Sequence, residues 1–205
     1  DARVRAIFAL TKLSGDGVLP VVAGLSSGDE RTIWNAVAVL GAIGDPRALA
    51  WVKAVHESTD SETVRSSASL ALERLSGRDP SALPNSTDLH IAAAIDHFMM
   101  DDAVVRPFDT PDAVWNWEGD GVVATQVPAI LRPLELAEQH CFAAIHHPTA
   151  QAILVATYAA EKAAVEAAET MEIELDAADS VEMLLKDIDV SLAAGGPARL
   201  SEALR

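Results

Sequence analysis

The sequence predicts an all-α protein, an αα superhelix (a solenoid of stacked antiparallel helix pairs) with a helical extension or bundle at its C-terminal end. Three observations predict this class. Half of the 205 residues are apolar, which is enough to bury a substantial core. Aromatic residues make up only 4% while Ala, Val and Leu are abundant, a composition typical of closely packed helices. The third observation is an apolar pattern that recurs along the first part of the chain.

The recurring pattern consists of four apolar residues separated by three, one and three positions, which places their side chains on one face of a helix. Successive sets begin 30 and then 32 residues apart. The sets are Ala6, Ala9, Leu10 and Leu13; Ala36, Val39, Leu40 and Ile43; and Ala68, Ala71, Leu72 and Leu75. Each set is expected to be the buried stripe of one helix.

Second helices are expected between these stripes, at about 17–27 and 46–57. Their apolar residues Leu19, Val22 and Leu25 recur 30 positions later as Leu49, Val52 and Val55. Gly44, Asp45 and Pro46 supply a helix C-terminus, an N-cap and a first helical residue for the turn between helices. A lone helix pair cannot bury its stripe, so the pairs are expected to stack.

The stretch Leu-Gly-Ala-Ile-Gly-Asp-Pro-Arg-Ala-Leu at 40–49, together with the stripes before and after it, resembles HEAT-like repeats of the short phycobilisome-lyase type. The period of about 30 residues fits this variant better than longer HEAT repeats. The resemblance covers residues 1–77 and implies a solenoid with a concave binding surface. It implies no particular activity, because one fold supports many functions.

The rest of the chain is expected to form three further segments. Residues 78–87 are a linker or a decayed repeat start. Residues 88–175 are helical hairpins, with helices near 88–101, 126–147 and 149–170 and an irregular loop at 102–121. Residues 176–205 are a capping helix and tail. The stripes expected to be buried are Ile91, Ala94, Ile95, Phe98 and Met99 in the first helix, and Ile153, Ala156, Ala160, Ala163, Ala164 and Ala167 in the third.

The formal charge of −16 argues against a nucleic acid or an anionic membrane surface as partner, because either would be repelled. No run approaches the roughly 18 apolar residues of a membrane span, and the charged N-terminus does not resemble a signal peptide. Cys141 is the only cysteine, which excludes an intrachain disulfide. We therefore predict a cytoplasmic protein.

No P-loop, dinucleotide turn, nucleophile elbow or paired-cysteine motif is found, so no cofactor is predicted and a non-enzymatic role is favoured. His140, Cys141, His146 and His147 were considered as metal ligands, but their spacing matches no compact zinc motif. No metal site is predicted from them. His90 and His97, seven residues apart, share one helix face that we expect to lie at the surface.

Six residues are candidates for partner binding: Trp34, Trp51, His56, Glu57, Trp115 and Trp117. Exposed Trp is common in binding hot spots, although packing between repeats is the simpler role for Trp34 and Trp51. Trp115 and Trp117 lie in a segment bounded by prolines. We do not expect both to be buried, so one of them is the better interface candidate.

These observations favour a scaffold for protein–protein interaction whose second helices line the concave side. The partner is another protein, with a basic one favoured by the acidity. One alternative is a lyase-like or other enzyme subunit that binds a small molecule in a groove near Trp34, Trp51, His56 and Glu57. Another is an acidic, partner-neutralising module of the immunity type, motivated by the charge alone.

Overall fold

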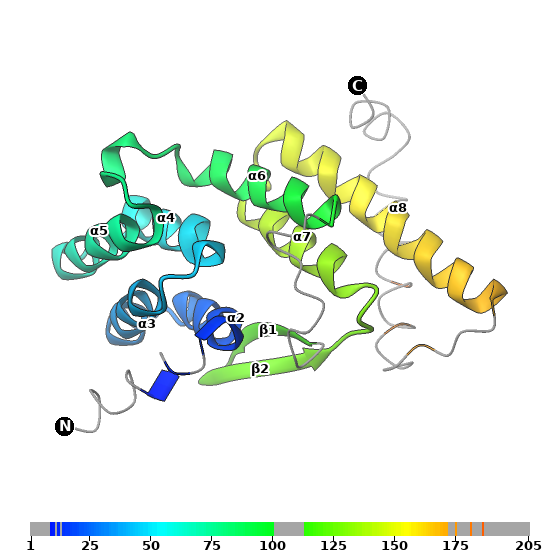
Figure 1. Ribbon diagram of the computed structural model, residues 1–205, viewed down its shortest axis with the longest axis horizontal. Helices are drawn as coiled ribbons and strands as arrows, with labels where there is room; N and C mark the ends of the chain where they lie inside the picture. The colour runs from blue at the N-terminus through cyan, green and yellow to red at the C-terminus, as the bar shows by residue number, and fades with distance from the viewer. Residues whose placement is uncertain are drawn as a thin grey trace. The chain divides into compact units, whose positions relative to one another are not determined.

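A computed structural model describes residues 9–10, 12, 14–100, 113–171, 175, 181 and 186 (Figure 1). The chain divides into two compact units. Unit 1 comprises residues 1–89 and 115–125, and unit 2 comprises residues 90–114 and 126–205. Unit 1 therefore contains the segment for which the repeats are predicted.

The helices bounded in the described part of unit 1 are α2 (Val18–Ala23), α3 (Glu30–Ile43), α4 (Leu49–Ser58) and α5 (Glu62–Ser76). Short 3-10 turns precede α2 (Ser14–Gly17), follow it (Gly24–Ser26), precede α4 (Pro46–Ala48) and follow α5 (Pro80–Ala82). Helix α3 packs against α2 and α5, and α4 packs against α5. The four helices are the blue to green-cyan elements of Figure 1.

The helix ends form where the sequence places capping residues. Asp29 accepts a hydrogen bond from the Thr32 backbone N–H at 2.7 Å and so caps α3. Ser61 caps α5 in the same way, through the backbone N–H of Val64. Gly44 ends α3, and Asp45 caps the turn that follows. The predicted division into helices and turns is therefore confirmed between residues 29 and 77.

Asp45 and Arg47 connect this turn to an earlier part of the chain. The Arg47 guanidinium lies 3.0 Å from Asp45 Oδ2, and both side chains are buried. The same guanidinium donates a hydrogen bond to the backbone carbonyl of Gly15 at 2.9 Å. The charged pair thus links turns that lie 32 residues apart in sequence.

The core of unit 1 confirms two predicted stripes. Ala36, Val39 and Leu40 are buried on α3, with Ile43 packed at their edge. All four members of the third stripe are buried on α5. Leu10 of the first stripe packs against the same core, but Ala9 is exposed, contrary to the prediction, and Ala6 and Leu13 lie outside the described residues.

A two-stranded sheet replaces part of the predicted irregular loop at 102–121. Strand β1 (Ala113–Glu118) pairs with β2 (Gly121–Gln126), and residues 115–125 belong to unit 1. Valines and tryptophans favour strands, and Gly119 has the positive φ of +60° that a two-residue hairpin loop requires. The fold is therefore mostly helical rather than purely so. Residues 101–112 lie outside the described part of the chain.

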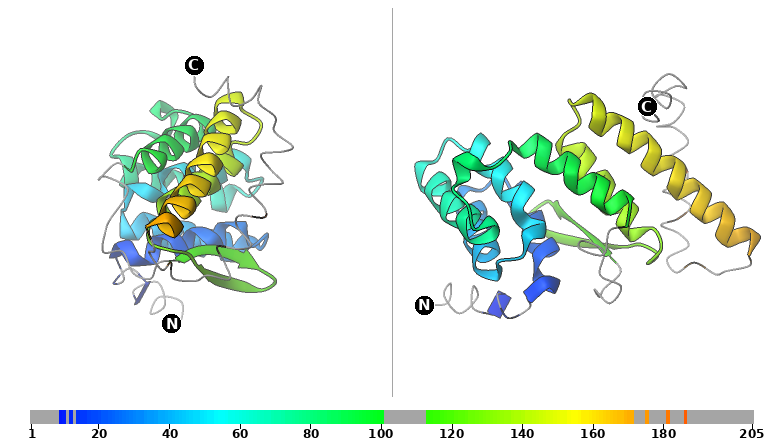
Figure 2. Two further views of the ribbon diagram at one scale, coloured as in Figure 1. Left: turned by 90° about the vertical axis from the view of Figure 1, so that its right-hand side faces the viewer. Right: turned by 45° about the horizontal axis from the view of Figure 1, so that its top comes forward.

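In its described residues, unit 2 contains α6 (Ser86–Phe98), whose first residues belong to unit 1, α7 (Arg132–Ala143) and α8 (Pro148–Thr170). They share a core formed by Ala94 of α6, Cys141 of α7, and Leu154 and Tyr158 of α8. Figure 2 gives two further views of these helices. The prediction that α7 begins near residue 126 is wrong, because β2 occupies residues up to 126.

The stripes predicted for α6 and α8 are partly wrong. Ile95 on α6 and Met99 just after it are exposed, while His90 and His97 are buried. On α8 the buried face is displaced from the predicted alanines and includes Leu154, Tyr158, Glu161, Val165 and Ala168. In both helices, polar side chains occupy positions that an apolar pattern alone does not assign to the interior.

The capping helix predicted near 179–193 lies outside the described residues except for isolated positions. One of these, Val181, is buried beside Leu131, Leu134 and Val165. None of the helices in the described part of the chain is long and apolar enough to cross a membrane.

Candidate functional site

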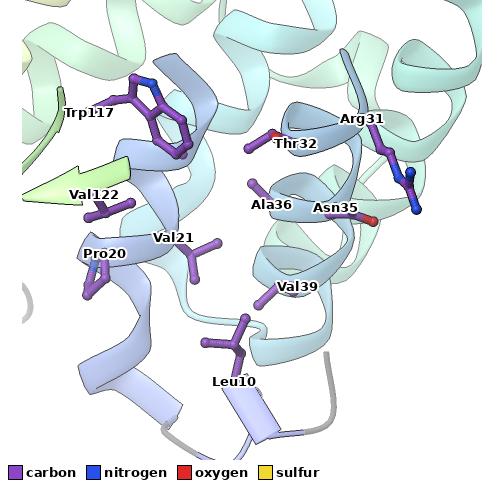
Figure 3. Close-up of a pocket in the computed structure, with 11 residues that line it drawn as sticks. Leu10, Pro20, Val21, Arg31, Thr32, Asn35, Ala36, Val39, Trp117 and Val122 are labelled. Atoms are coloured by element: carbon purple, nitrogen blue, oxygen red, sulfur yellow. The ribbon is translucent and has the colours of Figure 1, made fainter. Parts of the chain in front are cut away.

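A groove of about 450 Å³ lies within unit 1, between α2, α3 and the β-hairpin. Pro20 and Val21 line it from α2, and Ala36 and Val39 line it from α3. Figure 3 shows Val21 facing Ala36 and Val39 across the groove. Ala36 and Val39 are three residues apart on α3, so the helix period places them side by side along the groove.

The two ends of the groove are formed by residues distant in sequence. Leu10 lies at one end and Trp117 of β1 at the other, with Val122 of β2 beside α2 (Figure 3). Arg31 points away from the groove interior. The wall of the groove is therefore mainly apolar, although Thr32 and Asn35 also line it, and it suits apolar side chains rather than a charged ligand.

The hairpin forms an accessible edge of this groove. Val122 and Val123 are equally exposed, at 39%, but only Val122 lines the groove. Neighbouring residues on a strand point to opposite faces, which explains the difference. Trp115 and Trp117, two apart on β1, share one face and are both half-buried. Neither is fully buried, in agreement with the expectation that they would not both be buried, and the choice of one as the better interface residue stays a prediction.

The remaining candidates for partner binding lie on the helices of unit 1. Trp34 is half-buried on α3, and Trp51 packs against the core from α4. Neither lines the groove, so the structure brings only Trp117 of the six candidates to it. Partner binding by Trp34 and Trp51 stays a prediction.

His56 and Glu57 make contacts inside unit 1. His56 Nε2 lies 3.2 Å from the Ser69 hydroxyl, and partial burial, followed by the Lys53 charge, lowers the pKa of the imidazole. Glu57 accepts hydrogen bonds from the backbone N–H and the hydroxyl of Ser86. Burial would raise the pKa of Glu57, but these hydrogen bonds and Lys53 lower it overall. Glu57 thus accepts hydrogen bonds from the first residue of α6 and stabilises the start of that helix.

Three histidines meet in the interior of unit 2. His90 Nδ1 lies 2.8 Å from His140 Nδ1, and the rings of His97 and His140 are stacked with centroids 5.5 Å apart. The expectation that His90 and His97 lie on a surface face is wrong, because both are buried. Burial lowers the pKa of His90 to about 4, and burial together with the two neighbouring imidazoles lowers that of His140.

Three glutamates form a second polar cluster in unit 2. Glu135 and Glu138 extend from α7 and Glu161 from α8, with a ligand oxygen of each within 4.8 Å of the others. Glu161 is fully buried, and neither of its carboxylate oxygens has a hydrogen-bond partner. Tyr158 donates a hydrogen bond to Glu138 Oε1 at 2.5 Å. Among the described residues, these glutamates are the group placed to hold a metal ion.

The environment of the glutamates opposes their ionisation. Burial, and then the charge of Glu138, raises the pKa of Glu135 to about 7. Burial, and then the charges of Glu135 and Glu138, raises the pKa of Glu161 to about 9. Two unit charges about 4.8 Å apart repel by roughly 3 kcal/mol at an effective dielectric constant of 20. A proton or a cation would relieve this repulsion.

The four residues considered as metal ligands from sequence are divided between interior and surface. His140 and Cys141 are buried, while His146 and His147 are exposed. His147 Nδ1 accepts a hydrogen bond from the Thr149 backbone N–H and so caps α8. Burial, followed by Glu138, raises the pKa of the Cys141 thiol to about 12, which makes it a poor nucleophile.

Sequence reasoning missed the glutamate cluster, although the chain contains a signal for it. Leu154, Tyr158, Glu161, Val165 and Ala168 follow one another at spacings of four, three, four and three, so Glu161 falls on an apolar helix face. Glu135 and Glu138 are three residues apart and share a face of α7. The groove was missed because its hairpin was not predicted.

Residues 1–73 match a family model described as HEAT repeats, so this segment is HEAT-like, as predicted. The comparison with curated proteins gave no match, and neither did the comparison with solved structures.

Proposed function

We propose that unit 1 is a protein-interaction module whose groove binds apolar side chains from a segment of a partner protein. The observation that carries this proposal is the mainly apolar groove between α2, α3 and the hairpin, whose two helical walls lie in the HEAT-like part of the chain. HEAT-like repeats commonly serve as interaction scaffolds. The proposal extends the repeats to a short superhelical stack, with Trp34 and Trp51 as further contacts.

The charge of the chain defines what the partner segment should carry beyond the groove. The sequence contains 31 acidic and 15 basic residues, giving a formal charge of −16. Basic residues flanking an apolar anchor would therefore be attracted to the surrounding surface and would accelerate association. The proposed occupant is a segment with apolar anchor residues and basic flanks, on a protein in the same compartment, which we propose is the cytoplasm.

The test compares two variants of the hairpin by native mass spectrometry after purification from the natural host. Val122→Arg places a charge in the groove wall, whereas Val123→Arg places the same charge at an equally exposed neighbour outside the groove. We expect a protein partner to co-purify with the wild type and with V123R, and to be lost from V122R. A buried charge without a partner opposes binding.

Two outcomes would contradict the proposal. A partner that remains bound to V122R would show that binding occurs elsewhere and would refute the groove as its site. A partner lost from both variants would indicate a general charge effect or a damaged hairpin. In that case the groove proposal would fail unless circular dichroism showed that V123R alone had unfolded.

A small-molecule ligand is the second candidate, favoured by the size of the groove. Its volume of about 450 Å³ lies within the roughly 300–1,000 Å³ typical of small-molecule sites. This reading corresponds to the lyase-like alternative suggested by the repeat resemblance. In the same mass spectra it predicts a small mass that is bound to the wild type, released on denaturation and absent from V122R.

A further inference from the structure

We propose that Glu135, Glu138 and Glu161 bind a hard divalent cation, of the Mg²⁺, Mn²⁺ or Ca²⁺ class, in the interior of unit 2. The site is distinct from the groove of unit 1 and independent of its function. The three side chains come from two helices that pack against each other, α7 and α8. Their oxygens converge to within 4.8 Å.

Glu161 is the residue that separates this cluster from an ordinary acidic surface. Surface glutamates are solvated by water, but Glu161 has no exposed area and neither carboxylate oxygen has a hydrogen-bond partner. A buried polar group without a partner costs about 1–3 kcal/mol, and more when it is charged. The side chain is nevertheless directed at two other carboxylates. A bound cation would satisfy its oxygens and balance the negative charge.

The spacing of the oxygens fits coordination of a cation. Oxygens on opposite sides of an ion are separated by about 4.0–4.2 Å for Mg²⁺ and about 4.6–5.2 Å for Ca²⁺. Three oxygens cannot all lie opposite one another, so separations of up to 4.8 Å require each oxygen to move inward by up to about 1 Å. All three potential ligands are carboxylates, which favours hard cations over Zn²⁺ or Cu⁺, whose sites use imidazole or thiolate.

Tyr158 acts as a positioning residue for the cluster. Its hydroxyl donates to Glu138 Oε1, and its ring is buried in the core beside Cys141 and Leu154. This hydrogen bond holds Glu138 in one orientation and leaves its other oxygen available for the cation. Ligands of metal sites are commonly oriented by such hydrogen bonds. The raised pKa values of Glu135 and Glu161 are consistent with a site that holds excess negative charge.

The test is titration of the full chain with MnCl₂, followed by electron paramagnetic resonance, in which bound Mn²⁺ loses the sharp six-line signal of the free ion. The metal-free protein is prepared with a chelator and measured at about 150 mM salt, so that weak binding to the acidic surface is screened. We expect about one tightly bound Mn²⁺ per chain, displaced by excess Mg²⁺ or Ca²⁺.

Glu161→Gln and Glu166→Gln form a matched pair on α8, because Glu166 is exposed and lies outside the cluster. We expect E161Q to weaken Mn²⁺ binding by about 10–100-fold or more, and E166Q to bind like the wild type. Glu135→Gln should give the same loss as E161Q, which keeps the test informative if E161Q fails to fold.

Two results would overturn the proposal. One is absence of bound Mn²⁺ in the wild type at about 1 mM free ion, the weak limit for protein sites of this kind. The other is equal binding by E161Q, E135Q and E166Q, which would mean that the acidic surface holds the ion. Either result would leave protons, not a cation, as the means by which the glutamates are neutralised.

Discussion

Buried histidines make the stability of unit 2 depend on pH. His90 is 1% exposed and shares a hydrogen bond with His140 through their Nδ1 atoms. One imidazole must donate and the other accept, so the pair cannot both be protonated and keep this bond. His97, stacked on His140, adds a third ring to the same interior. The cluster therefore favours neutral histidines.

We expect the histidine cluster to make folding sensitive to mild acid. The folded pKa of His90, about 4, lies below the value of 6.5 for a free side chain, so the unfolded chain binds this proton first. The contribution of His90 is complete above pH 6.5 and is lost as pH falls toward 4. The loss is on the order of 2 kcal/mol between pH 7 and pH 5. Urea denaturation of the wild type and His90→Gln at several pH values measures it.

The comparison between variants is essential because the raised pKa values of Glu135 and Glu161 act in the opposite direction. We expect the stability difference between wild type and H90Q to shift against the wild type as pH falls. His146→Gln, at an exposed position, should follow the wild-type profile. Parallel profiles for wild type and H90Q in the presence of a chelator would contradict the prediction.

At the scale of elements, α3 and α5 approach each other closely at Gly41. A Cβ added at Gly41 would lie 2.7 Å from the Cβ of Ala71 and 2.8 Å from its Cα. Carbon atoms normally approach no closer than about 3.5 Å. The glycine on α3 and the alanine on α5 therefore set the distance between two helices that carry predicted stripes.

Gly41→Ala should destabilise unit 1 by about 1–3 kcal/mol, because α3 and α5 must move apart and lose packing. The sign is informative, since Gly to Ala in an open helix usually stabilises by up to about 1 kcal/mol. Gly24→Ala is the control, because its added Cβ would meet Ala36 at an ordinary 3.7 Å. Denaturant unfolding measures both variants. G41A that is as stable as the wild type would refute this account of the helix contact.

The elements also show what the sequence could predict. The stripes on α3 and α5 were predicted correctly because apolar residues there repeat with the helix period and every buried position is apolar. The same method misplaced the buried faces of α6 and α8, where His90, His97 and Glu161 are interior. Apolar periodicity cannot identify a buried polar side chain, because what neutralises it comes from another helix.

The hairpin and the groove lay beyond prediction for a related reason. Val122, Val123 and the tryptophans of β1 have strand propensity, but a short apolar run fits a helix as well as a strand. The groove then needs residues 10, 36 and 117 in one place, which is a property of tertiary structure. The local sequence therefore predicts the helices that form two walls of the groove, but not the hairpin that forms the third.

At the scale of the whole molecule, charge is the dominant sequence property. The chain has 31 acidic and 15 basic residues. The ion pair between Glu62 and Arg65 is largely exposed, and such pairs contribute little to stability. The acidic residues outnumber the basic ones, so the carboxylates repel one another. This repulsion is stronger in the compact folded state than in the expanded unfolded chain, so it opposes folding.

We expect added salt to stabilise the whole chain by screening this repulsion. Raising NaCl from about 20 mM to about 200 mM shortens the screening length from roughly 20 Å to below 10 Å. The free energy of unfolding should rise by about 1 kcal/mol, equivalent to about 2–4 °C in melting temperature for a chain of this size. Thermal unfolding at fixed pH with a chelator present measures the effect, and KCl should act identically because screening depends on ionic strength. A melting temperature that is constant or falls over this range would show that the carboxylates are balanced locally, and would also remove the electrostatic reason for expecting a basic partner.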